Sequence, residues 1–381
     1  MKILFPFYPL HSGTFPSDKV QDGVVASCNM QIEALLAHGH EVTLIVTRDF
    51  EVNDSRVGVI TGDFDSKELA GKTPWTPLTK KILEVESEFD VIILNMAELP
   101  MTNGDIRTRF EKILPRVRVI YHHYDERAFS SFFVTQYQFM AWVKQNGGKV
   151  FTVSMLFNAE SWYRFKKKDV ITSNPYHNYH LPTTLEEFDH LDMTVALEPK
   201  EPLTEDGGYV MIGRASPEKN ILLGIQAYCK TPLQEPLYVF TCPSSAKKEV
   251  KYFNSIMATQ DDPRVHVQVS ATREQILYRL SRARCVLYPS KKESFGLVAM
   301  EAMSYGCDLI YSDSHAFFAK EEGKLVRHPT LKSFSEAIVY RRREEEFSFS
   351  WQSKKDRSEA FRDEHSLEQF QERYCFSLLN D

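Results

Sequence analysis

The chain has 381 residues, of which 43% are hydrophobic and 26% are charged, and its formal net charge is −6. This composition is typical of a soluble globular protein, and the length predicts two domains that each have their own core. No apolar run approaches the roughly 20 residues that a membrane-spanning helix needs. The six scattered cysteines also lack the Cys-x-x-Cys spacing of a zinc site. We therefore expect a protein of a reducing cytoplasm, without a membrane span, a disulfide framework or a metal site.

The first half of the chain opens with the pattern of a parallel α/β sheet. A strand is predicted at 2–7, a polar loop at 11–23, a helix at 24–38 and a second strand at 41–47. This order of elements is that of a doubly wound sheet. The loop lacks the Gly-x-Gly-x-x-Gly pattern of dinucleotide-binding proteins, so NAD or FAD binding is not favoured.

Four further strands are predicted before the middle of the chain, at residues 57–60, 91–94, 117–121 and 150–153. The loops that follow parallel strands gather at one edge of the sheet, where α/β proteins bind ligands. His122, His123 and Asp125 come after the strand 117–121, so we expect them at this edge. A histidine in such a place is a packing residue about as often as an active-site residue, and both interpretations stay open.

The segment from Asp105 to Lys168 is basic. It holds twelve Lys and Arg residues against five acids, and Arg127, Lys166 and Lys167 are among the basic ones. Aromatic side chains are interleaved with them. One interpretation is a solvated face beside an aromatic core, and the other is a surface for a polyanionic partner.

A second α/β pattern begins after a proline-containing segment, 181–206, which is predicted to be a linker. Its predicted strands are 209–212, 237–242, 265–269 and 285–288, and its predicted helices are 220–229 and 272–283. We therefore predict two Rossmann-like doubly wound domains that face a central cleft, residues 1–180 and 207–354. Residues 355–381 show helical spacing.

The most informative stretch runs from Tyr288 to Gly306. A buried strand ends before Pro289, Glu293 follows in a turn, and a helix begins after Gly296 and carries Glu301 about two turns along. A helix N-terminus attracts phosphate, and carboxylates accept hydrogen bonds from sugar hydroxyl groups. The stretch therefore predicts a site for a phosphorylated sugar compound.

Arg214 and Lys219 follow the strand 209–212 and would complete a clamp for a diphosphate, because Arg offers a planar fork and Lys a point charge. Taken alone, Lys219 is more often a solvated turn residue, and Glu301 is a typical surface residue of a helix. The combination of these residues on neighbouring turns favours a binding site.

Two motifs carry a resemblance to a known family. Gly213-Arg-x-x-Pro217-x-Lys219 and Ser290-x-x-Glu293-x-Phe295-Gly296-Leu297-x-x-x-Glu301-Ala302-Met303-x-x-Gly306 resemble the motifs of retaining GT-B glycosyltransferases, which use nucleotide-sugar donors. Asp308 stands where the family commonly has Pro.

The resemblance implies a role for each matching position. Arg214 and Lys219 would hold the donor diphosphate, Glu293 would contact the reacting sugar, and Glu301 the nucleotide ribose. Backbone groups of the remaining donor-site residues would meet the phosphate or the sugar; these are Ser294, Phe295, Gly296, Leu297 and, from the first loop, Gly23.

The resemblance also implies retention of the anomeric configuration and a metal-independent reaction. No cofactor is expected beyond the nucleotide-sugar co-substrate, for which a UDP-sugar is favoured. The helical tail 355–381 would cross back to the N-terminal domain. Asp63 and Asp65 form an Asp-x-Asp pattern, which we interpret as a loop rather than a metal site.

A weaker likeness concerns the acceptor. Residues 89–95, 118–123 and 212–214 are similar in order and spacing to segments of phage alpha-glucosyltransferases that act on hydroxymethylcytosine in DNA. It implies that Asp125 is an acidic catalytic group and that the protein works in the cytoplasm of a phage host. Tyr124 interrupts the His-Asp pair of that group. The resemblance to the GT-B family implies that His123 lies near the reacting sugar.

We therefore expect hydroxymethylated pyrimidine in double-stranded DNA as the acceptor. His122, Arg127, Lys166 and Lys167 are the predicted contacts to it, because a basic face suits a phosphate backbone. The target base would have to be turned out of the duplex.

Other functions stay open. The acceptor could be a glycan, a lipid-linked compound or a small molecule. The fold also occurs in phosphorylases and sugar-nucleotide epimerases, and a protein that binds sugars or nucleic acid without catalysis is a third class. The oligomeric state is not predicted.

Overall fold

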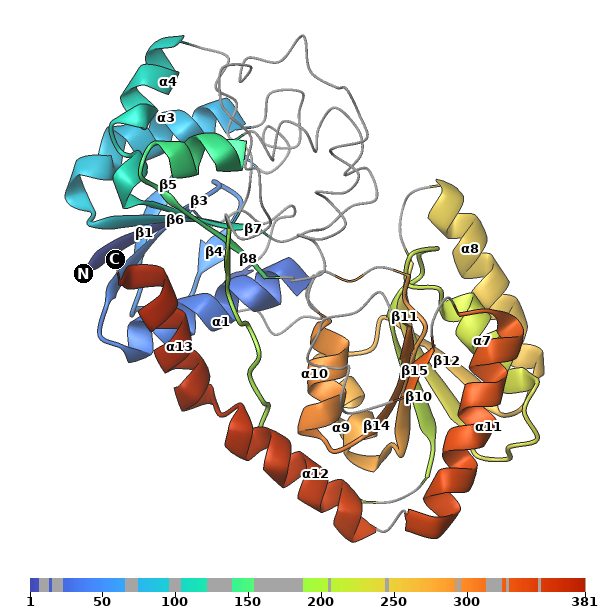
Figure 1. The fold of residues 1–381 in the computed structure, drawn as a ribbon. Coiled ribbons are helices and arrows are strands. Elements are labelled where there is room, and N and C mark those ends of the chain that lie inside the picture. Colours follow the sequence, from blue (N-terminus) through green and yellow to red (C-terminus); the bar gives the residue numbers. More distant parts are fainter. Residues whose placement is uncertain are drawn as a thin grey trace. The chain divides into compact units, whose positions relative to one another are not determined.

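The computed structural model describes residues 1–6, 14–15, 23–65, 75–95, 104–121, 139–153, 188–204, 207–243, 247–291, 293, 296–312, 324–326, 329–348 and 351–380. The chain divides into two compact units (Figure 1). Unit 1 comprises Met1–Ser17, Gln21–Met193 and Phe370–Asp381, and unit 2 comprises Asp18–Val20 and Thr194–Gln369.

Unit 1 is built on a seven-stranded sheet in the order β5-β3-β1-β6-β7-β8-β9, and every neighbouring pair is parallel. The strands are β1 (Lys2–Pro6), β3 (Glu41–Val46), β5 (Gly58–Thr61), β6 (Val91–Leu94), β7 (Val117–Tyr121), β8 (Lys149–Thr152) and β9 (Asp189–His190). A two-stranded ribbon pairs β2 (Thr14–Phe15) with β4 (Glu51–Val52). The central strands β6 and β7 are buried throughout, as expected for a parallel sheet that is covered on both faces.

Helices cover both faces of this sheet (Figure 1). Those that follow the strands are α1 (Gly23–Ala37), α3 (Trp75–Val85) and α4 (Gly104–Glu111), with short 3-10 turns at Glu86–Glu88 and Leu114–Arg116. The last helix, α13 (Leu367–Leu379), also packs on unit 1. Its Tyr374 hydroxyl donates to Oε1 of Gln31 on α1 at 2.9 Å, and Nε of Arg118 donates to the Leu378 carbonyl at 3.0 Å.

Unit 2 is built on a six-stranded parallel sheet in the order β12-β11-β10-β13-β14-β15. The strands are β10 (Tyr209–Arg214), β11 (Leu237–Cys242), β12 (Val265–Val269), β13 (Cys285–Tyr288), β14 (Asp308–Ser312) and β15 (Lys324–Val326). In chain order this is 3-2-1-4-5-6, the order of a doubly wound fold, in which ligands bind beyond the carboxyl ends of the strands where the order reverses. Here the reversal lies between β10 and β13.

The helices of unit 2 lie on both faces of the sheet (Figure 1). They are α7 (Ile221–Cys229), α8 (Lys247–Met257), α9 (Arg273–Arg282), α10 (Leu297–Ser304), α11 (Leu331–Ser348) and α12 (Trp351–Glu364), with a 3-10 turn at Ala258–Asp261. The start of α9 is fixed by a capping box, in which Thr272 accepts from the Gln275 backbone N–H and the Gln275 side chain accepts from the Thr272 backbone.

The boundary between the two units follows Met193 and lies within the predicted linker 181–206. Within it, Phe188 belongs to the core of unit 1, and β9 extends the sheet beside β8. The following residues pack in unit 2, where the Leu197 N–H donates to Oγ of Ser304 at 2.9 Å. The described residues on both sides of the boundary at Met193 are therefore packed, because their apolar side chains are buried in one unit or the other.

The predicted tail helix 355–381 is divided between the two units. Helix α12 packs on α10 of unit 2, where the Ser358 hydroxyl donates to the Ser304 carbonyl at 2.5 Å. Lys354 is buried, and its Nζ donates to the Ala283 carbonyl at 2.6 Å and the Ser281 carbonyl at 2.9 Å, at the end of α9. Only the residues from Phe370 onwards pack with unit 1.

Candidate functional site

The turn after β10 is tied to the end of β13. The backbone N–H of Lys291 donates to the Glu218 carbonyl at 2.7 Å, and Nδ2 of Asn220 donates to the Pro289 carbonyl at 3.2 Å. Asn220 has a φ of +52°, a left-handed conformation that Asn tolerates better than most residues. These bonds bring the Arg214–Lys219 turn to the loop that carries Glu293, as the sequence predicted.

Lys219 and Glu293 form an ion pair in this loop. Nζ of Lys219 lies 2.6 Å from Oε1 of Glu293, and the side chain of Glu293 is only 7% exposed. Tyr288, at the end of β13, is hydrogen-bonded to the same carboxylate. Burial and the Glu293 charge raise the pKa of Tyr288, so its hydroxyl stays protonated and donates to Glu293. Lys219 and Tyr288 thus both stabilise this buried carboxylate.

Helix α10 begins beside this pair. Gly296 precedes it with a φ of +90°, which a residue with a Cβ rarely adopts, and its carbonyl accepts from the Ala299 N–H at 2.9 Å. The first N–H groups of a helix have no partner within the helix and favour negative charge. Leu297 is the first residue of α10, so two predicted donor-site residues, Gly296 and Leu297, lie at its start.

Glu301 lies on the second turn of α10 and is paired with Arg273, the first residue of α9. Nη1 of Arg273 donates to Oε1 of Glu301 at 2.5 Å, and the Glu301 side chain is 9% exposed. Burial raises the pKa of Glu301, and the charge and hydrogen bond of Arg273 act in the opposite direction. Arg273 was not among the residues predicted from the sequence. Its only signal is that it follows β12 at the sheet edge that also carries Arg214 and Lys219.

The remaining predicted site residues lie in several parts of the chain. Arg214 ends β10 and is exposed, in the same unit as the two ion pairs. Gly23 is the first residue of α1, in unit 1. Ser294, Phe295, His122, His123, Asp125, Arg127, Lys166 and Lys167 lie outside the described residues.

Asp308, the departure from the family's Pro, opens β14 and is 2% exposed. Arg341 of α11 forms an ion pair with it, in which Nη2 donates to Oδ1 at 2.9 Å. Asp308 is therefore a structural residue of unit 2. Its ion pair with Arg341 compensates the cost of burying its charge.

Asp63 and Asp65 follow β5 in a loop, as predicted. In the described part of the chain, no three His, Cys, Asp or Glu side chains gather as a metal site requires. Among the described helices, none has the length and apolar character to cross a membrane.

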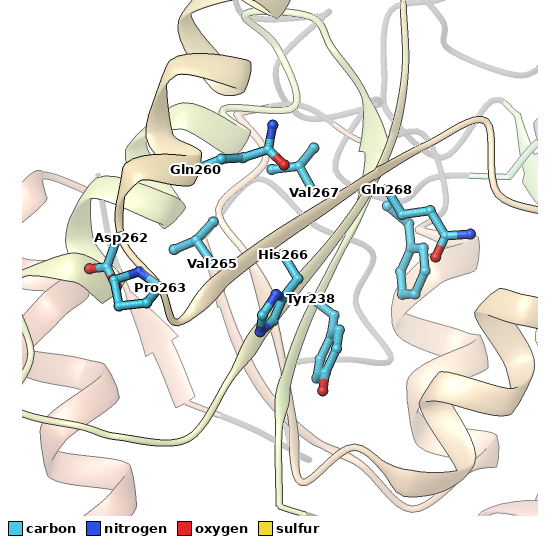
Figure 2. A pocket seen from close by; sticks show the side chains of 9 residues that line it. Tyr238, Gln260, Asp262, Pro263, Val265, His266, Val267 and Gln268 are labelled. Atoms are coloured by element: carbon cyan, nitrogen blue, oxygen red, sulfur yellow. The ribbon is translucent and has the colours of Figure 1, made fainter.

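A hollow of about 500 Å³ lies along β12, and none of its lining residues belongs to these ion pairs (Figure 2). Tyr238 and His266 line it, and their rings stack with centroids 5.2 Å apart. It contains none of the predicted site residues, so it does not contribute to the candidate site.

The chain was compared with known proteins by sequence and by structure. Residues 197–338 match the family model described as "Glycosyl transferases group 1". No curated protein matches the chain by sequence.

Solved structures match over nearly the whole chain. Sucrose-phosphate synthase from Thermosynechococcus elongatus is 16% identical with a TM-score of 0.66, and the match covers 98% of this chain and 96% of that chain. WaaG, a glycosyltransferase involved in lipopolysaccharide biosynthesis, is 13% identical with a TM-score of 0.65 and full coverage of both chains. HepE from Anabaena, solved in complex with UDP and glucose, is 15% identical with a TM-score of 0.63, and 99% of each chain is covered.

At these identities the structural likeness establishes the fold. The two parallel sheets of the described residues agree with it, as does the strand order of unit 2. The chain therefore has the GT-B fold with two Rossmann-like units, and its residues 197–338 match the model of the group 1 glycosyltransferases.

Proposed function

We propose that the protein transfers a sugar from a nucleotide-diphosphate sugar to a hydroxyl acceptor with retention of configuration. The observation that carries the proposal is the pairing of Lys219 with Glu293, at the point of unit 2 where the strand order reverses. The match of residues 197–338 to group 1 glycosyltransferases supports it. A UDP-sugar is the favoured donor, which the UDP complexes of the similar protein HepE support.

The ion pair is suited to exchange partners when a donor binds. A phosphate oxygen of the donor replaces the Glu293 carboxylate at Nζ of Lys219, and Arg214 adds a second cation. Glu293, released from Lys219 but still bonded to Tyr288, then accepts hydrogen bonds from the sugar. After the exchange, Lys219 is paired with the donor phosphate, and the Glu293 carboxylate is stabilised by hydrogen bonds from Tyr288 and the sugar.

In the transfer step, the bond between the anomeric carbon and the diphosphate oxygen breaks, and its electron pair leaves with the nucleotide diphosphate. The acceptor oxygen forms the new bond and gives its proton to the leaving phosphate. Lys219 and Arg214 stabilise the charge that develops on the diphosphate, so the reaction is proposed to need no metal. From the sequence alone, His123 is proposed for the reacting sugar and Asp125 as an acidic catalytic group.

The proposed acceptor is hydroxymethylated pyrimidine in double-stranded DNA, in the cytoplasm of a phage host. This part of the proposal depends on the basic segment between Asp105 and Lys168 and on the likeness to phage alpha-glucosyltransferases. His122, Arg127, Lys166 and Lys167 are the proposed contacts. A glycan, a lipid-linked compound or a small molecule is the alternative acceptor.

The test is a panel of UDP-, GDP- and ADP-sugars incubated with plain and hydroxymethylated DNA, followed by mass analysis of the nucleosides. We expect a hexose or pentose on the hydroxymethylated base only. Unmodified DNA in every reaction, together with transfer to another hydroxyl compound, would exclude the DNA acceptor and leave the glycosyltransferase intact.

A matched pair of variants tests the enzyme itself. Glu293→Ala should abolish transfer, whereas Glu274→Ala, which removes an exposed acid from α9, should not. Unchanged turnover in Glu293→Ala would refute the role of the ion pair. Donor consumption that does not depend on an acceptor would indicate a different class of sugar-nucleotide enzyme.

A further inference from the structure

The environment of Glu301 demands a partner for its charge. The carboxylate lies on a helix whose residues Ala299 to Ser304 are all buried. An ionised carboxylate in such a place is costly unless a cation and hydrogen bonds compensate it. Arg273 is the cation, and it reaches Glu301 from a side chain that is itself 39% exposed.

The position of Arg273 is fixed by its own helix. The capping box between Thr272 and Gln275 encloses it, with the Gln275 N–H 3.2 Å from Oγ1 of Thr272 and the Thr272 N–H 2.9 Å from Oε1 of Gln275. The backbone at residue 273 is thus held by two bonds that do not involve the arginine side chain. Its guanidinium is therefore presented to Glu301 from an ordered helix start.

The bond between Arg273 and Glu301 uses Oε1. A carboxylate has about four acceptor positions, so the pairing leaves capacity for two further hydroxyl donors. Vicinal hydroxyl groups of a ribose are donors of that kind. The charge-assisted bond restrains Oε1 of the carboxylate, which limits the directions from which the hydroxyl groups can approach.

Resting on the proposed function, we propose that Arg273 is a positioning residue that holds the Glu301 carboxylate ionised and oriented to accept hydrogen bonds from the ribose hydroxyl groups of the donor nucleotide. Arg273 acts through Glu301 and sets the preference for ribose over deoxyribose. This assigns a role to a residue that lies outside both sequence motifs.

The charges around Glu301 favour this role. In the described part of the chain, the titratable groups that interact electrostatically with Glu301, besides Arg273 on α9, are Tyr288 on β13 and Tyr305 just beyond the end of α10. Burial raises the pKa of both tyrosines, so they stay neutral and do not compete for the charge. Without Arg273, burial alone would act on Glu301 and raise its pKa further. The carboxyl group would then take up a proton at higher pH and lose acceptor capacity.

Calorimetric binding of UDP and 2′-deoxy-UDP tests the proposal without any need for turnover. We expect the wild type to bind UDP more tightly than 2′-deoxy-UDP. Arg273→Met should weaken UDP binding about tenfold, the effect of one lost charge-assisted hydrogen bond. It should affect 2′-deoxy-UDP much less, and the loss should grow as the pH falls, because burial raises the pKa of Glu301. Arg273→Lys, which keeps the charge, should restore part of the preference.

Two controls separate this role from a general effect on folding. Arg282→Met removes another arginine of α9, one that lies over the Tyr278 ring, and should leave UDP binding unchanged. Glu301→Gln should remove the ribose preference, and Arg273→Met should add nothing in that background. Circular dichroism of each variant shows that it is folded.

Specific results would overturn the proposal. If Arg273→Met weakens UDP and 2′-deoxy-UDP equally, and does so in Glu301→Gln as well, Arg273 contacts the diphosphate or the base directly. If Arg273→Met binds both as the wild type does, Arg273 has no role in binding. A wild type that binds none of UDP, GDP and ADP would instead refute the proposed function itself; if only GDP or ADP binds, that nucleotide and its deoxy form are the probes.

Discussion

Replacing Gly306 by alanine should loosen the packing of α12 on the rest of unit 2. Gly306 follows α10 with a φ of +64°, and a Cβ built there would lie 2.0 Å from the backbone carbonyl oxygen of Lys354. Such a contact is too short to be tolerated, and a backbone atom cannot turn away as a side chain can. Helix α12 must therefore move, which disturbs the bonds of Lys354 to the end of α9.

The expected magnitude has two parts. A left-handed conformation costs an alanine about 1 kcal/mol relative to glycine. Forcing a methyl group into a packed contact costs about 1–3 kcal/mol more. Gly306→Ala should thus lower the free energy of unfolding by about 3 kcal/mol, which corresponds to a melting temperature about 6–12 °C lower in a unit of this size.

Gly207 provides the matched control in the same unit. Its φ is +77°, and among the described residues no atom lies within 4 Å of an added Cβ. Gly207→Ala should therefore carry only the conformational cost of about 1 kcal/mol. Differential scanning calorimetry of both variants measures the difference. Equal shifts would refute the argument that close contact with α12 requires glycine at position 306.

Two further predictions concern ion pairs of unit 2. Arg341→Met leaves the Asp308 carboxylate, which is 2% exposed, without its cation. It should lower the free energy of unfolding, measured with denaturant, by about 3–5 kcal/mol. If the double variant Asp308→Leu with Arg341→Met is no more stable than Arg341→Met alone, the unpaired charge is not the cause. The hydrogen bond from Arg264 holds the pKa of Asp262 below its ordinary value of 3.8, so the contribution of this acid to stability is present above that pH and is lost as the pH falls below it. Asp262→Asn should therefore destabilise the protein by about 2 kcal/mol near neutral pH and by clearly less at about pH 3. A difference from the wild type that does not vary with pH would contradict this.

Much of the fold could be predicted because the buried strands of parallel sheets are continuous apolar runs. The strands at 91–94, 117–121, 237–242, 265–269 and 285–288 have the predicted bounds. The break between α12 and α13 was not predicted, although Ser366 and Gln369 form a capping signal there. The Gln369 N–H lies 3.2 Å from Oγ of Ser366, and the Ser366 N–H lies 3.2 Å from Oε1 of Gln369.

The candidate site could be predicted where its residues lie in one local pattern. Lys219 follows β10, and Glu293 and Glu301 lie on either side of one helix start, so the parallel order of the strands brings them to one sheet edge. Arg273 could not be found in this way. It is 28 positions from Glu301, and its place at the start of α9 does not indicate which carboxylate its side chain reaches.

The sequence by itself determined two α/β units, the strand ends that carry charged residues, and the likeness to GT-B glycosyltransferases. Only the tertiary structure decided how the buried charges are matched, with Lys219 on Glu293, Arg273 on Glu301 and Arg341 on Asp308. The physical reason is that helices, strands and turns depend on hydrophobic periodicity and turn chemistry, which involve only a few neighbouring residues. The partner of a buried charge depends instead on which elements pack together, and a long side chain can reach any neighbour that packing provides.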